Sequence, residues 1–133
     1  MRARHSQFLA SSSKRKIVFD RSVSEDFAVF CQMHRQSGRL DAAATVRLGT
    51  LAAALEADLP TPDLIIYFSV EEAVLRRRIS IVGHPNLIVE SLSTQLCLYD
   101  EWIASRSESV LLIDNSRCRS GLLGELLFGD SEC

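Results

Sequence analysis

Three short runs of aliphatic and β-branched residues divide the chain and predict buried strands. They lie at residues 17–19, 64–70 and 110–114. The middle run is apolar at almost every position, which is typical of a strand covered on both faces. Segments with helical periodicity separate the runs. Strands that alternate with helices predict an α/β fold, in which a three-layer parallel sheet carries helices on both faces.

Polar residues and glycines predict where the first long helix begins and ends. Ser22 and Glu25 have the spacing of a capping box, in which each side chain accepts a hydrogen bond from the other residue's backbone amide. The helix that follows has its apolar positions at i, i+3 and i+4, and Gly38 is a natural end for it.

Further helices follow from the same kind of signal. Asp41 can cap a helix over about residues 42–57, and Pro60 and Pro62 must end it because proline lacks the amide donor and restricts the residue before it. One face of this helix is apolar, with Leu48, Leu51, Ala52 and Leu55. Other helices are predicted at about residues 71–80, 88–105 and 120–128.

Composition excludes several classes of protein. A chain of 133 residues suits one domain, and its net charge of −2 gives no basic footprint for nucleic acid. The longest apolar run, at residues 64–70, is far shorter than the roughly 20 residues that span a bilayer. The four cysteines form no C-x-x-C pair, which favours reduced thiols over a zinc site. Reduced thiols suit a reducing compartment, so we expect a cytoplasmic location.

The first sixteen residues differ from the rest. Residues 1–16 hold several basic residues and serines and no acid, a composition that resembles a mitochondrial presequence. A solvated helix end followed by a loop explains the same composition. A mitochondrial location is therefore the alternative to a cytoplasmic one.

Polar side chains follow each predicted strand, namely Asp20 and Arg21, then Ser69, then Asp114. In parallel sheets the ligand binds beyond the carboxyl ends of the strands. Asp20 can hold Mg²⁺ through water or help to take a hydroxyl proton, and Arg21 can fix an oxygen of a phosphoryl acceptor. A local ion pair that caps the next helix is the alternative.

The order of motifs resembles the deoxynucleoside kinase family from about residue 17 to 114. The matching text is VFDRSVSEDFAVF, SGRLD, LPTPDLIIYFSV, LRRRI, YDEW and VLLID. The resemblance implies part of a P-loop kinase fold at residues 17–128, between the basic segment and a tail at 129–133. It also implies transfer of a phosphoryl group from ATP, with Mg²⁺, to the 5′-hydroxyl of a deoxynucleoside. A homodimer is compatible with it.

The resemblance implies roles for individual residues. Asp20 corresponds to the acid near Mg²⁺ and the reacting hydroxyl, and Arg21 to the arginine that holds the 5′-oxygen region. Asp26 corresponds to an acid that reads the base edge, and Phe30 to a ring that packs on the base. Their i, i+4 spacing puts both on one helix face. The alternatives are an acid stabilised by the helix dipole and a core aromatic residue.

Two further arginines, Arg76 and Arg78, correspond to the start of the family's arginine-rich lid and could contact phosphate. A solvated helix face also explains such a basic run. The lid pattern then departs from the family, because Val82 and His84 stand where arginines are expected.

The phosphate-binding loop of such kinases has the pattern G-x-x-x-x-G-K-[ST]. None of the six glycines precedes Lys-Ser or Lys-Thr. We therefore expect this chain alone to bind neither ATP nor Mg²⁺ and to be inactive. Three interpretations stay open: part of an active kinase, a degenerate kinase that binds nucleosides or a protein, and an unrelated module with a chance match.

Overall fold

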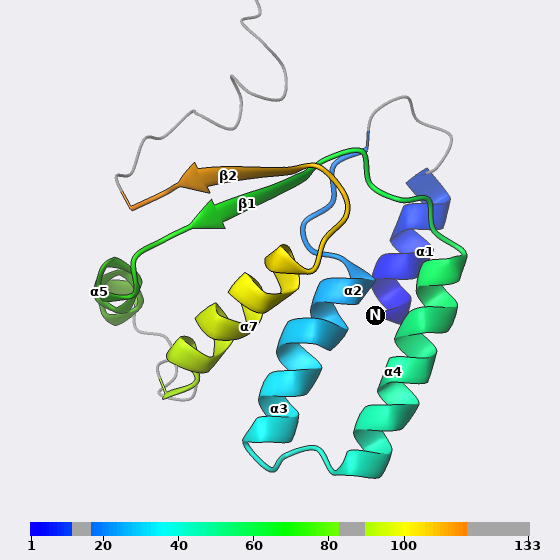
Figure 1. Cartoon of the computed structure of the whole chain (residues 1–133), viewed down its shortest axis with the longest axis horizontal. Coiled ribbons are helices and arrows are strands. Elements are labelled where there is room, and N and C mark those ends of the chain that lie inside the picture. The colour runs from blue at the N-terminus through cyan, green and yellow to red at the C-terminus, as the bar shows by residue number, and fades with distance from the viewer. Residues whose placement is uncertain (12–16, 83–89, 117–133) are drawn as a thin grey trace, which may run out of the picture.

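The computed structural model describes residues 1–11, 17–82 and 90–116, in which helices precede and separate two strands (Figure 1). The predicted helix at 120–128 and the lid position His84 lie outside these residues. The elements are α1 (Arg2–Ser11), α2 (Val23–Glu25), η1 (Asp26–Cys31), α3 (Gln32–Gln36), α4 (Ala42–Ala57), β1 (Ile65–Ser69), α5 (Glu72–Val82), α7 (Leu92–Ala104) and β2 (Val110–Asp114).

The two strands β1 and β2 form a parallel pair. Ile65 lies opposite Val110 at one end, and Ser69 lies opposite Asp114 at the other. The predicted strands at 64–70 and 110–114 and their parallel direction are thus confirmed. Parallel strands need a crossover, and the chain between them supplies it with α5 and α7.

The strand predicted at residues 17–19 is wrong. This segment is extended but belongs to no sheet, and Val18 is 64% exposed. A strand is defined by its hydrogen-bond ladder with a neighbouring strand, and the only described sheet consists of β1 and β2. Helix α1 holds the segment instead, because the rings of Phe8 and Phe19 stack with centroids 4.7 Å apart.

The described helices α3, α4 and α7 lie on one side of the sheet (Figure 1). Three large apolar side chains of the strands are exposed on the sheet, Phe68 (39%), Leu111 (37%) and Leu112 (62%). The second layer of helices, expected because residues 64–70 are almost continuously apolar, is not seen in this part of the chain.

The core lies between η1, α3 and α7. Val29 is fully buried and packs with Met33, Leu98 and Trp102, while Ile65 of β1 packs against this cluster. Burying one such side chain contributes about 1.5–3 kcal/mol. The cluster therefore fixes the start of the first long helix against α7.

The helix ends follow the predicted caps. The hydroxyl of Ser22 accepts a hydrogen bond from the amide of Glu25 at 3.0 Å, and the carboxylate of Asp41 accepts one from the amide of Ala44 at 2.6 Å. Gly38 takes the left-handed conformation (φ 73°) that ends a helix. Helix α4 has the predicted bounds, and no helix in the described ranges is long and apolar enough to cross a membrane.

The predicted helix between Ser22 and Gly38 is present, but its middle is π-helical at Asp26–Cys31. Such wide turns are rare and are often found at functional sites. The next helix comes very close to this turn, because a Cβ atom added to Gly49 of α4 would lie 2.9 Å from the ring of Phe27.

Candidate functional site

Arg21 has an unusual backbone. It joins the extended segment to α2 with φ 70°, and it is the only described residue other than glycine with a positive φ. This conformation costs about 1–2 kcal/mol for a residue with a Cβ atom. The guanidinium carbon lies 4.7 Å from the ring centroid of Phe30, and Nε lies 3.9 Å from Oε1 of Glu25. The structure thus brings Arg21 and Phe30 together.

Glu25 is buried at the centre of this arrangement. Its Oε1 accepts a hydrogen bond of 2.5 Å from the hydroxyl of Tyr99 on α7. Burial raises the pKa of Glu25, although Tyr99, Arg21 and the amide of Ser22 all act to lower it. Burial and the neighbouring Glu25 together raise the pKa of Tyr99 well above its usual value.

The sequence had suggested only a capping role for Glu25. The amide of Ser22 does act on it, as the capping box predicts, but its carboxylate also accepts a hydrogen bond from Tyr99 of α7. The i, i+4 spacing of Arg21 and Glu25 was the available signal that the acid also serves the arginine.

Aromatic rings connect this site with the sheet. The ring of Tyr99 stacks on Tyr67 of β1 with centroids 5.9 Å apart, and it meets Phe30 edge-on at 6.3 Å. Phe30 is half-buried and packs against the core cluster as well as against Arg21. Its position is therefore compatible with the core role and with a ligand contact.

Asp26 points to a different neighbour. Its carboxylate accepts a hydrogen bond of 2.9 Å from Nε of Arg4 on α1, and the amino group of Met1 lies 3.1 Å from it. Arg4 also donates to the carbonyl oxygen of Asp20 at 2.8 Å. Although Asp26 and Phe30 are four residues apart, Asp26 contacts α1 whereas Phe30 contacts Arg21 and α7. Sequence reasoning missed Arg4, whose only signal was the basic character of residues 1–16.

Asp20 has an exposed side chain without a partner among the described residues. Ser69 and Asp114 do lie side by side at the carboxyl ends of the strands, as expected. Asp20 does not share this sheet edge through strand pairing, because its segment is not a strand. Within the described ranges, no group of three or more His, Cys, Asp or Glu side chains could hold a metal ion.

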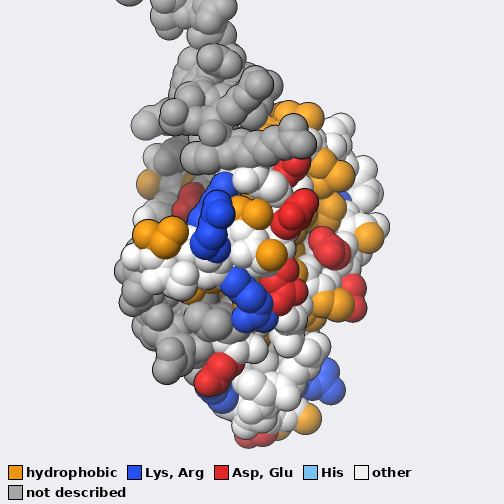
Figure 2. Space-filling view, turned by 90° about the vertical axis from the view of Figure 1, so that its left-hand side faces the viewer, with side chains coloured by type: hydrophobic (Ala, Val, Ile, Leu, Met, Phe, Trp, Pro, Cys, Tyr) orange, Lys and Arg blue, Asp and Glu red, His pale blue; other side chains and the backbone are white. Residues whose placement is uncertain are grey.

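The two predicted lid arginines are engaged within the protein. Arg76 pairs with Glu72 at 2.6 Å and donates to Ser93 of α7 at 3.1 Å, and its hydrogen bond lowers the pKa of Glu72. Arg78 donates to the carbonyl oxygen of Asn115 at 2.8 Å. On the side that carries α5, basic side chains lie among acidic and hydrophobic ones (Figure 2).

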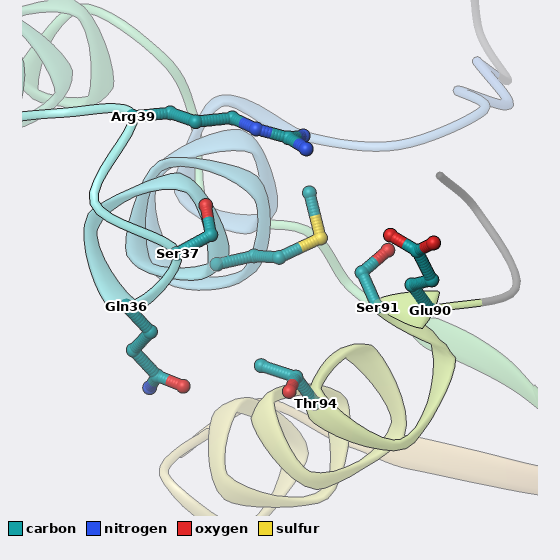
Figure 3. A pocket seen from close by; sticks show the side chains of 7 residues that line it. Gln36, Ser37, Arg39, Glu90, Ser91 and Thr94 are labelled. Atoms are coloured by element: carbon teal, nitrogen blue, oxygen red, sulfur yellow. The ribbon is translucent and has the colours of Figure 1, made fainter. Parts of the chain in front are cut away.

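A hollow of about 290 Å³ lies between the end of α3 and the start of α7 (Figure 3). Met33 lines it together with polar residues that include Arg39, Glu90 and Thr94. A guanidinium and a carboxylate in one open hollow suit a small polar ligand. None of the residues named above as sequence candidates lines it.

The family model for deoxynucleoside kinases matches residues 1–119. The chain belongs to the deoxynucleoside kinase family. The match confirms the resemblance carried by the motifs and implies a P-loop kinase fold, and it includes α1 with Arg4. No curated protein and no solved structure matches the chain.

The deoxynucleoside kinase family implies ATP and Mg²⁺, and the residues present fit these two groups unequally. Mg²⁺ in such enzymes is held by one or two carboxylates together with substrate phosphates, and Asp20 offers one exposed carboxylate. A triphosphate needs backbone amides and basic groups around it, but the sequence has no phosphate-binding loop, and Arg76 and Arg78 are engaged.

Proposed function

We propose that this chain forms the nucleoside-binding side of a deoxynucleoside kinase. The observation that carries the proposal is the contact between Arg21 and Phe30 at the start of one helix, where the guanidinium carbon lies 4.7 Å from the ring centroid. Asp26 lies in the same helix and faces Arg4 of α1. This helix follows the Asp-Arg-Ser motif, so the acceptor-side residues that the family resemblance assigns lie close together in the sequence.

The base of the nucleoside would meet Asp26 and Phe30. Asp26 offers carboxylate oxygens as acceptors and Arg4 offers guanidinium donors beside them, so the pair can bind a base edge that has a donor next to an acceptor. The ring of Phe30 can pack on an aromatic base. The side chain of Arg21 would then hold the oxygen at the 5′ end of the sugar.

Phosphoryl transfer itself is a separate matter. Such catalysis depends on positioning phosphates and stabilising their charge. Asp20 would hold Mg²⁺ when it is bound, and that ion would supply the charge stabilisation. These 133 residues lack the loop that positions the triphosphate, so we propose binding of the nucleoside without transfer.

Ligand-observed NMR with several deoxynucleosides tests the proposal. The incomplete pocket should bind with a dissociation constant of order 1 mM, about −4 kcal/mol. Asp26→Ala and Phe30→Ala should each remove most of the saturation-transfer signal. Asp63→Ala and Phe68→Ala change an exposed acid and an exposed ring away from the helix and should keep it. No signal for the wild type, or the same signal for all five proteins, would contradict nucleoside binding here.

A further inference from the structure

We propose that Glu25, held by Tyr99, is a positioning residue that fixes the side chain of Arg21 toward the bound nucleoside. The inference rests on the proposed function for the identity of the ligand. Its structural part, the ordering of Arg21, can be tested without any ligand.

Helix α7 donates hydrogen bonds to two adjacent residues of α2. The hydroxyl of Tyr99 donates to Glu25, and the indole Nε1 of Trp102 donates to Oγ of Ser24 at 2.9 Å. Arg106 donates to the same hydroxyl of Ser24 at 3.1 Å. Tyr99 is in turn held by its stacking on β1 and by the core. The carboxylate of Glu25 is therefore placed by α7 and the sheet as well as by the cap of its own short helix.

Arg21 depends on this carboxylate. Its side chain is 45% exposed, and Glu25 is its only ionic partner among the described residues. A long exposed side chain on a left-handed residue has many orientations available to it. The ring of Phe30 restricts it from one direction, and Oε1 of Glu25 restricts it from the other. Together these two contacts restrict the guanidinium of Arg21 to one orientation.

The negative charge of Glu25 is not explained by folding alone. A neutral amide can also accept a hydrogen bond from Tyr99, and burying a carboxylate is unfavourable. The groups that face Glu25 are Tyr99 on α7, Arg21, the amide of Ser22 and the like-charged Asp26. Arg21 is the one cation among them, so the negative charge of Glu25 attracts and orients the guanidinium of Arg21.

The experiment follows the Nε–Hε signal of Arg21 in ¹⁵N correlation spectra of the full chain, together with deoxynucleoside binding. In the wild type without ligand this signal should be resolved, with a positive heteronuclear NOE. Glu25→Gln should abolish that order while the melting temperature does not fall, and nucleoside affinity should weaken about tenfold, the factor that corresponds to ~1.4 kcal/mol. Tyr99→Phe should loosen Arg21 in the same direction.

Glu72→Gln is the matched control, because it breaks the i, i+4 pair of Arg76 on α5 and should leave Arg21 unchanged. If Arg21 stays ordered in Glu25→Gln, or if that variant loses stability while Arg21 stays in place, the role of Glu25 is structural and the inference is wrong. If the wild type binds no deoxynucleoside but Glu25→Gln still frees Arg21, the proposed function fails and the positioning role stands. If Tyr99→Phe does not fold, Glu25→Gln decides alone.

Discussion

The hydroxyl of Tyr99 donates a hydrogen bond of 2.5 Å to the carboxylate of Glu25, which lies 74 residues earlier in the chain. The bond joins α7 to α2, the short helix that directly follows the Asp-Arg-Ser motif. It places a buried acid between an aromatic layer on one side and the strained Arg21 on the other.

Tyr99→Phe should destabilise the protein by about 1–3 kcal/mol, because it leaves a buried carboxylate without its donor. Urea denaturation followed by circular dichroism measures this loss. Tyr67→Phe is the control, since Tyr67 stacks on the same ring but its hydroxyl bonds to no described residue. Equal losses of stability in the two variants would show that the hydrogen bond to Glu25 does not contribute to stability.

Glu25→Gln should make the protein more stable at neutral pH. Burial raises the pKa of Glu25 above 4.5 in the folded state, so the folded protein binds this proton more tightly than the unfolded chain does. The stability linked to that proton is fully present below pH 4.5 and is lost as the pH rises through the folded pKa. As the pH rises through this range, the free energy of unfolding of the wild type therefore decreases relative to that of Glu25→Gln.

Urea denaturation of both proteins at a series of pH values between 4 and 8 measures this difference. Titrations that the two proteins share cancel in the subtraction. A stability difference that stays constant with pH would contradict the raised pKa of Glu25.

Gly49→Ala should lower the stability by about 1 kcal/mol, because overpacking against the ring of Phe27 outweighs the gain in helix propensity. In a Phe27→Leu background the ring is gone, and the same change should instead stabilise α4 by about 1 kcal/mol. Thermal denaturation of the four proteins in this cycle gives the coupling. Additive effects would mean that α4 and η1 are not in close contact.

These 133 residues should not phosphorylate deoxynucleosides. The sequence has no phosphate-binding loop, and Arg76 and Arg78 already bind partners within the protein. A radiolabel transfer assay with ATP and Mg²⁺ should show no turnover above a blank without enzyme. Turnover that disappears in Asp20→Ala would overturn this expectation.

The sequence by itself determined the local elements and the family. Caps and breakers act within one or two turns of the chain, so Ser22, Asp41 and Gly38 predicted helix ends that the structure has. The strands at 65–69 and 110–114 were equally readable from their apolar runs. The Asp-Arg-Ser and Pro-Asp-Leu motifs identified the deoxynucleoside kinase family without any coordinates.

Only the tertiary structure decided which distant groups meet. Residues 17–19 have the composition of a strand, yet a strand forms only when a neighbour supplies its ladder, and here Phe19 stacks on Phe8 of α1 instead. Arg4 reaches Asp26 over 22 residues of sequence, and Tyr99 reaches Glu25 over 74. Such bonds depend on how helices pack, and the pattern of residues along one helix does not predict which side chains another helix places beside it.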